Sequence, residues 1–171
     1  MAATREDLFA HLAALGIGTE TLEHPPVFTV EEARSVHGRL PGAHTKNLFL
    51  KDKAGALWLA SMREEVAADL KALARHVGAK RFSFASPELL LERLGVAPGS
   101  VSPFALLSDT GRTVSFALDA GLLRAPALNF HPLTNEATTA IAPADFLRFL
   151  ESLNVTPHLV DFAGLAGSDP R

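Results

Sequence analysis

Residues 42–51 read Gly-Ala-His-Thr-Lys-Asn-Leu-Phe-Leu-Lys, and the rest of the chain is arranged around this stretch. The apolar run that follows Asn47 indicates a strand, and residues 52–55 predict a turn into a second strand through Trp58. Lys46 is therefore expected at the mouth of the first strand, with its ammonium group free to meet an anion. A solvated surface lysine is the plainer interpretation, because lysines are seldom buried.

Length and composition indicate one globular domain. With 171 residues and 47% hydrophobic content, we expect a single core in residues 1–163 and a disordered tail in 164–171. No apolar run approaches the ~18 residues that span a bilayer, and the N-terminal residues lack the order of a signal peptide. The chain has no cysteine, which excludes disulfides and thiolate catalysis and fits a cytoplasmic protein.

Outward from this stretch, the pattern predicts several helices and short strands. We expect helices after Thr4, from Thr29 towards Val36, from Val66 to Val77, from Ser86 to Gly95 and from Pro143, and strands at 19–23, 114–118 and within 121–141. Between residues 45 and 141 the strands cluster instead of alternating with helices. The predicted fold is therefore α+β, with a mixed, largely antiparallel sheet or partial barrel and helices packed around it.

Charge is uneven along the chain. The net charge of −3 argues against general coating of nucleic acid, but no acidic residue occurs from Leu70 to Pro87. We expect a local basic patch, formed by Lys51, Lys71, Arg75, Lys80 and Arg81. An ordinary solvated helix face is the alternative.

Three common kinds of catalytic site find little support. The seven histidines form no His-Glu-x-x-His pair, so no metal or other cofactor is expected. Neither a Gly-x-Ser-x-Gly elbow nor a phosphate-binding loop is present. What remains is a set of residues able to hold a small polar substrate: Lys46, Asn47, the loop from Gly99 to Pro103, and His131.

Four stretches occur in order along nearly the whole chain: HPPVFTVEEA (24–33), GAHTKNLFL (42–50), GVAPGSVSPF (95–104) and NFHPL (129–133). Together they resemble the YbaK / aminoacyl-tRNA synthetase-associated domain family. Within that family, the chain is most similar to the free-standing editing proteins that deacylate alanyl-tRNA(Pro). These are relatives of the editing insertion in bacterial prolyl-tRNA synthetase.

The resemblance implies hydrolysis of the ester between a wrong amino acid and the terminal adenosine of tRNA. The family lysine corresponds to Lys46 and the loop glycine to Gly99. A histidine at position 131 suits the alanine-editing and synthetase-insertion branches better than the cysteine-editing branch. An aminoacyl ester is already activated, so orienting water and stabilising the developing oxyanion would suffice.

The resemblance implies two partners, the acceptor stem of aminoacylated tRNA(Pro) and prolyl-tRNA synthetase. The phosphates of the acceptor stem are expected to contact the basic patch. A pocket lined by Phe28, Val30, Ser102 and Pro103 is expected to accept a methyl group and reject the proline ring, with Asn47 helping to place the aminoacyl group. Two other classes of protein stay open. One binds aminoacyl-tRNA without hydrolysing it, and the other docks on a synthetase.

Overall fold

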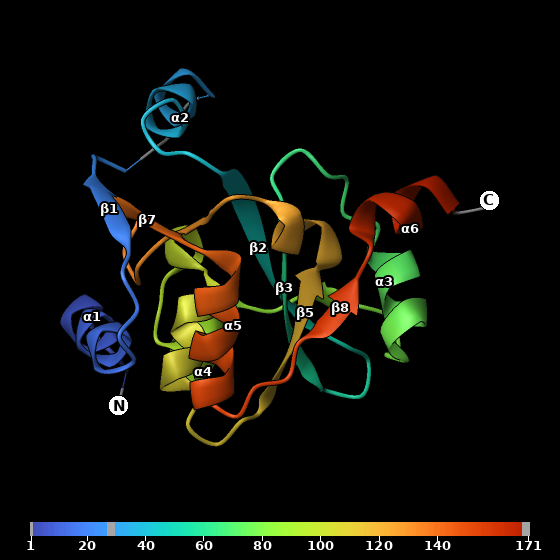
Figure 1. The fold of residues 1–171 in the computed structure, drawn as a ribbon. Coiled ribbons are helices and arrows are strands. Elements are labelled where there is room, and N and C mark those ends of the chain that lie inside the picture. Colours follow the sequence, from blue (N-terminus) through green and yellow to red (C-terminus); the bar gives the residue numbers. More distant parts are fainter. Residues whose placement is uncertain (1, 27–29, 169–171) are drawn as a thin grey trace.

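A computed structural model describes residues 2–26 and 30–168 (Figure 1). Its strands are β1 (Glu20–Glu23), β2 (Ala43–Lys51), β3 (Leu57–Arg63), β4 (Ser83–Phe84), β5 (Val114–Asp119), β6 (Leu128–Phe130), β7 (Ala137–Ile141) and β8 (His158–Val160). Its α-helices are α1 (Arg5–Ala14), α2 (Val30–His37), α3 (Leu70–Val77), α4 (Pro87–Leu94), α5 (Pro143–Ser152) and α6 (Phe162–Ser168). Three 3-10 helices complete the described elements: η1 (Pro98–Ser100), η2 (Pro103–Ser108) and η3 (Ala120–Arg124).

The strands form one mixed sheet in the order β1-β7-β6-β2-β3-β5-β8, and β4 adds to the far half of β2. The pairs β1–β7, β6–β7, β2–β3 and β2–β4 are antiparallel, whereas β2–β6, β3–β5 and β5–β8 are parallel. The mixed α+β fold predicted from the clustered strands is therefore confirmed. Within the described residues, no helix has the length and apolar character needed to cross a membrane.

Two apolar cores lie on the two sides of the sheet, because side chains alternate along each strand. On β2, Phe49 belongs to the larger core, which also contains Phe116 and Phe146, while Leu50 belongs to the smaller one. Figure 1 shows α4 and α5 on one side of the central strands and α3 and α6 on the other. Strands β3 and β5 are thus covered on both faces, whereas the first half of β2 is only partly buried.

Local sequence signals explain where most helices begin. Thr4 accepts from the Asp7 amide in a capping box, and Ser86 caps α4 immediately before Pro87. Two expected boundaries are wrong. Asp69 caps the third helix, so this helix begins at Leu70 and not at Val66. Residues 120–124 form the 3-10 helix η3 instead of a strand.

The position of Lys46 also differs from expectation. Strand β2 begins at Ala43, because its first residues pair with β6, so Lys46 lies inside the strand and not at its mouth.

At the C-terminus, α6 continues to Ser168, where the sequence suggested a frayed tail from Gly164. The Asp161 carboxylate accepts from the Gly164 amide, and buried Phe162 anchors the helix in the smaller core.

Candidate functional site

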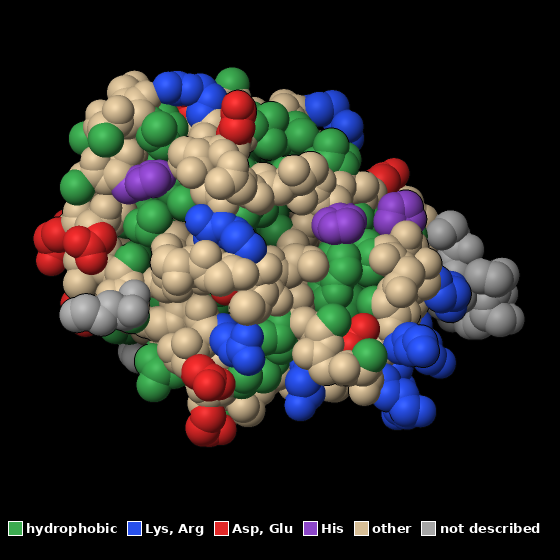
Figure 2. All heavy atoms as spheres, turned by 90° about the horizontal axis from the view of Figure 1, so that it is seen from below, with side chains coloured by type: hydrophobic (Ala, Val, Ile, Leu, Met, Phe, Trp, Pro, Cys, Tyr) green, Lys and Arg blue, Asp and Glu red, His purple; other side chains and the backbone are tan. Residues whose placement is uncertain are grey.

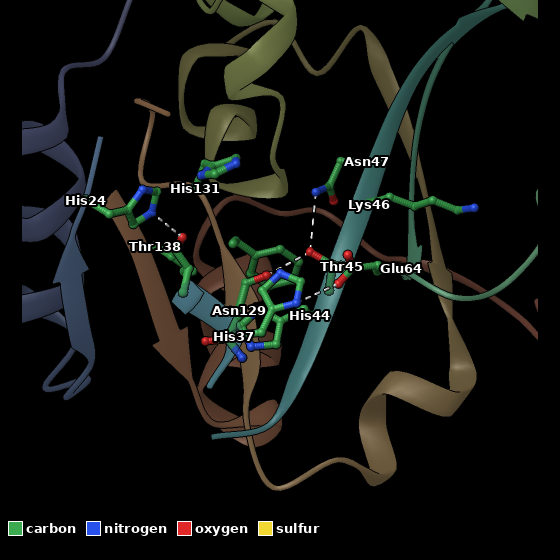
Figure 3. A pocket seen from close by; sticks show the side chains of 12 residues that line it. His24, His37, His44, Thr45, Lys46, Asn47, Glu64, Asn129, His131 and Thr138 are labelled. Atoms are coloured by element: carbon green, nitrogen blue, oxygen red, sulfur yellow. Dashed lines mark hydrogen bonds and ion pairs between the residues drawn. The ribbon is translucent and has the colours of Figure 1, made fainter. Parts of the chain in front are cut away.

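A cavity of about 210 Å³ opens beside the first half of β2 (Figure 3). Its walls come from segments that are far apart in the sequence, because β6 pairs with β2 and β7 brings β1 alongside. The lining residues are His24, Val36, His37, His44, Thr45, Lys46, Asn47, Glu64, Asn129, Phe130, His131 and Thr138. Most of these side chains carry hydrogen-bonding groups, so the cavity suits a small polar ligand.

A chain of hydrogen bonds fixes the Asn47 amide at this cavity. Fully buried Ser61 donates its hydroxyl proton to Asn47 Oδ1 at 2.5 Å. Asn47 Nδ2 donates to Thr45 Oγ1 at 3.4 Å, and Thr45 in turn donates to the Asn129 carbonyl at 2.8 Å. The amide group is therefore oriented, and its second N–H is left to meet a ligand.

Two of the histidines that line the cavity have tautomers that are fixed by hydrogen bonds. His131 Nδ1 lies 2.9 Å from the Ala137 carbonyl, which can only accept, so this nitrogen carries the proton. Burial lowers the pKa of His131, and nearby His24 lowers it slightly further, so the ring is neutral at pH 7 with a lone pair on Nε2. His24 is held in the same way between the Pro25 carbonyl and the Thr138 hydroxyl, each at 2.8 Å.

A second pair of histidines lines another part of the same cavity. The rings of His37 and His44 stack with their centroids 3.9 Å apart, and His37 Nδ1 lies 3.4 Å from a Glu64 carboxylate oxygen. Burial lowers the pKa of His44, and the positive charge that His37 can carry lowers it further. Among the described residues, no group of three or more His, Cys, Asp or Glu side chains could hold a metal ion.

Asn129 fixes the entry into β2. Its Nδ2 donates to the Pro41 and Ala43 carbonyls at 3.0 and 3.1 Å, while its buried Oδ1 has no hydrogen-bond partner among the described residues. Between these two carbonyls, Gly42 adopts φ = 99°, and a Cβ atom there would lie 2.4 Å from the Ala127 carbonyl oxygen. A glycine is therefore required where the chain turns into the site.

The sequence-predicted residues fall into three groups. Lys46, Asn47 and His131 line the cavity, although Figure 3 shows the Lys46 side chain directed away from the labelled histidines. Lys46 makes no hydrogen bond or ion pair with the described residues. Gly99 is exposed on η1, and the Ser102 hydroxyl caps η2 beside buried Pro103, so none of these three lines the cavity. Phe28 lies outside the described residues, as does the side chain of Val30.

The predicted basic residues lie away from the cavity. All five are exposed: Lys51, Lys71, Arg75, Lys80 and Arg81. Lys71 and Arg75 project from α3, whereas Lys51 ends β2, at the opposite end of the strand from the cavity. The chain reversals at 52–55 and 78–81 meet through a hydrogen bond from the Lys53 amide to the Lys80 carbonyl.

Sequence reasoning left several cavity residues without a role. His24, Thr138 and Asn129 reach the cavity only because β1 pairs with β7 and β6 with β2, and no local spacing reveals such pairings. Ser61 gave no signal at all. The one available hint was that four of the seven histidines fall in the stretches 24–44 and 129–133.

Comparison with known proteins identifies the family of this chain. The model of the aminoacyl-tRNA editing domain matches residues 24–149. A prolyl-tRNA synthetase associated domain-containing protein 1 from Danio rerio is 44% identical, covering 92% of this chain and 87% of that protein. The prolyl-tRNA editing protein ProX of Acetoanaerobium sticklandii is 31% identical, with 86% and 91% covered.

A solved structure described as a candidate trans-editing enzyme for prolyl tRNA synthetase has the same fold. It superimposes with a TM-score of 0.67 at 22% identity, covering 94% of this chain and 97% of the other. The match of the family model spans most of the chain and includes every described residue of the cavity wall. The chain belongs to the aminoacyl-tRNA editing domain family.

Proposed function

We propose that this protein is a free-standing deacylase that hydrolyses the ester of mischarged Ala-tRNA(Pro), releasing alanine and tRNA. Membership of the editing family supports the reaction class, and the relative named prolyl-tRNA editing protein ProX supports the tRNA. The observation that carries the proposal is the pairing of an oriented Asn47 amide with a neutral His131 in one small polar cavity.

These two groups match what ester hydrolysis requires. The water oxygen bonds to the ester carbonyl carbon, and the bond from that carbon to the ribose oxygen breaks. His131 Nε2 accepts the proton that the water loses, and the ribose oxygen takes up a proton as it leaves. The remaining N–H of Asn47 donates to the carbonyl oxygen, on which negative charge develops.

Lys46 has a separate part in this proposal. Its side chain is directed away from the histidines (Figure 3). We therefore assign its ammonium group to the phosphate of the terminal nucleotide instead of the scissile ester. Lysine suits this part because its ammonium group binds phosphate as a compact charge on a long stem. We assign Gly99, Ser102 and Pro103 no contact with the ester, because they lie outside the cavity wall.

Specificity for alanine follows from the limited room. A cavity of about 210 Å³ must hold the aminoacyl group and part of the ribose. A proline ring that displaces the ester by about 1 Å can lower the rate about a hundredfold. Serine is the second candidate, because the hydroxyl oxygen of Thr138, which is held by His24, lines the cavity and can accept from a serine hydroxyl.

Deacylation rates of Ala-, Ser-, Cys- and Pro-tRNA(Pro) test the proposal. We expect rapid release of alanine at catalytic protein concentrations and sparing of Pro-tRNA(Pro). Faster release of serine than of alanine would replace the substrate and keep the reaction. Binding of all four RNAs without hydrolysis would refute the deacylase and leave a module that only binds aminoacyl-tRNA.

A further inference from the structure

One edge of β2 is unpaired over part of its length. On the side away from β3, β6 pairs with Ala43 and His44, and β4 pairs with Leu50 and Lys51. Residues 45–49 lie between these two partner strands. Among the described residues, no strand pairs with the middle of this stretch on that side, so Asn47 lies at an open edge of the sheet.

The hydrogen bonds of β2 show which way the Asn47 backbone points. The Glu64 amide donates to the His44 carbonyl at 3.0 Å, on the side of β3. In an antiparallel pair such bonds occur at alternate residues, so the odd-numbered residues of β2 point their backbone groups away from β3. The Phe49 carbonyl accordingly accepts from the Ala85 amide on the opposite side, at 3.0 Å. The amide and carbonyl of Asn47 point to that side as well.

These two backbone groups of Asn47 have no hydrogen-bond partner in the part of the chain that the structure describes. They lie where neither β6 nor β4 reaches. A backbone polar group that is removed from water without a partner costs free energy, so nearly all such groups are paired in native proteins. Asn47 is half-buried, and its backbone is therefore a candidate for binding a ligand.

The cavity described above meets this open edge. Thr45, Lys46 and Asn47 all line it, although neighbouring side chains on a strand point to opposite faces. Figure 3 shows the side chains of Lys46 and Asn47 leaving β2 in different directions. Consecutive residues can line one cavity where that cavity faces the edge of their strand. Phe130 and His131, at the end of β6, line the same cavity.

An aminoacyl ester carries the two groups that such an edge binds. Its α-ammonium group donates hydrogen bonds, and its carbonyl oxygen accepts them. One Cα atom separates the two groups, as it separates the amide and carbonyl of a strand residue. Opposite residues in an antiparallel hydrogen-bonded pair exchange both of their bonds. An alanyl group can therefore bond to Asn47 as one strand residue bonds to another.

We propose that the Asn47 backbone binds the aminoacyl group in this way. Its carbonyl accepts from the α-ammonium group, and its amide donates to the ester carbonyl oxygen. That oxygen then has a backbone donor in addition to the Asn47 side chain, and both donors stabilise its developing negative charge. The inference rests on the proposed function, because it takes the ester to be the ligand. It adds a requirement for a free α-amino group.

The charges around the cavity permit this arrangement. Apart from histidines, Lys46 and Glu64 are the titratable side chains among the described lining residues, and Lys46 is directed away from the labelled histidines (Figure 3). Lysine and arginine side chains gather at the lower right of the face seen from below (Figure 2), and Lys51 lies at the far end of β2. Four residues of strand span about 13 Å, which exceeds the screening length of about 8 Å at physiological ionic strength. Lys51 therefore repels an α-ammonium group at Asn47 only weakly.

Binding of a stable analogue tests the contact without relying on catalysis. The probe is 3′-alanylamino-3′-deoxyadenosine, in which an amide replaces the ester and the ammonium and carbonyl groups are kept. In hydrogen exchange followed by NMR, saturation with this analogue should slow exchange of the Asn47 amide proton about ten-fold. The Phe49 amide is the control, because it points to the same edge while Phe49 lies outside the cavity wall.

Replacing the ammonium group tests the contact with the Asn47 carbonyl. Lactyl-tRNA(Pro) has a hydroxyl group in place of the α-ammonium group of Ala-tRNA(Pro). Each deacylation rate is divided by its uncatalysed rate, because the ammonium group itself activates the ester. The normalised kcat/KM should be about ten- to a hundredfold lower for the lactyl ester, because a hydrogen bond to a charged group is lost.

Glu64 is the rival partner for the ammonium group, because its carboxylate also lines the cavity. Glu64→Gln should keep the preference for the alanyl over the lactyl ester. Glu65→Gln is the matched control, because Glu65 is exposed and lies outside the cavity wall. Loss of the preference in Glu64→Gln alone would assign the ammonium group to that carboxylate and overturn the proposal.

Two other results would also overturn it. One is an unchanged exchange rate of the Asn47 amide at saturating analogue, and the other is equal normalised rates for the alanyl and lactyl esters. Failure of the proposed function is distinct from these results. It would appear as slowed exchange of the Asn47 amide with the analogue bound, but no hydrolysis of any aminoacyl ester.

Discussion

Replacing Ser61 by alanine tests whether the orientation of Asn47 matters for the reaction. Ser61 is fully buried, and its hydroxyl holds Asn47 Oδ1 at 2.5 Å. Removing it deletes one hydrogen bond and leaves a partly buried acceptor unpaired, at a cost of about 1–2 kcal/mol in the free energy of unfolding. The amide can then rotate and present its oxygen to the developing oxyanion, where it repels instead of donating.

The expected kinetic result is a loss confined to the chemical step. Loss of an interaction that is made only in the transition state lowers kcat and kcat/KM equally. We expect about a ten-fold loss of each, equivalent to about 1.4 kcal/mol. Single-turnover deacylation of Ala-tRNA(Pro) measures it. Ser108→Ala is the matched control, because its hydroxyl accepts from the Ala3 amide at 2.8 Å, remote from the cavity. An unchanged kcat in a folded Ser61→Ala protein would refute the orienting role.

Lys46→Ala should lower kcat/KM for aminoacyl-tRNA about a hundredfold with little loss of stability, since the ammonium group has no partner among the described residues; wild-type turnover would remove Lys46 from the site. Burial lowers the pKa of His131 and His44 below the value of the unfolded chain, so stability present above about pH 6.5 should decline as the pH falls through that value. His131→Asn should make the urea midpoint fall less between pH 7.5 and 5.5, and an identical fall would show that His131 is not the group responsible. Gly42→Ala should destabilise the protein by more than about 2 kcal/mol, because the new Cβ atom meets the Ala127 carbonyl oxygen. Gly55→Ala is the control: Gly55 has a similar φ of 94° with open space around it, so this change should cost only the backbone strain of about 1 kcal/mol. Equal losses of stability in thermal unfolding would refute the clash with Ala127.

Local chemistry made most elements predictable from the sequence. The cap at Thr4, the Ser86-Pro87 pair and the stop at Gly95 each act through neighbouring backbone groups, and the structure places them at helix ends. The early start of β2 was missed because Ala43 and His44 become strand through pairing with β6, some 85 residues away. Their own side chains do not indicate a strand.

The site was only partly predictable for the same reason. Lys46, Asn47 and His131 belong to stretches that carry the family resemblance, so their presence at the cavity could be anticipated. The groups that orient them could not, since Ser61 and Ala137 act through single hydrogen bonds across the sheet. Such contacts depend on strand register, which a single sequence does not display.

The pairing of β1 with β7 has a consequence for how this protein is made. Glu20 lies opposite Ala140, and Ala43 opposite Leu128, so the sheet around the cavity joins segments that are separated by about half of the chain or more. Contacts this distant in sequence close late and slowly during folding. Because synthesis proceeds from the N-terminus, a growing chain holds Lys46 and Asn47 long before His131 and Thr138 emerge from the ribosome. The nascent protein therefore lacks a complete cavity until translation has passed residue 138, so the proposed deacylase activity would be absent until then, although translation surrounds the chain with correctly charged tRNA.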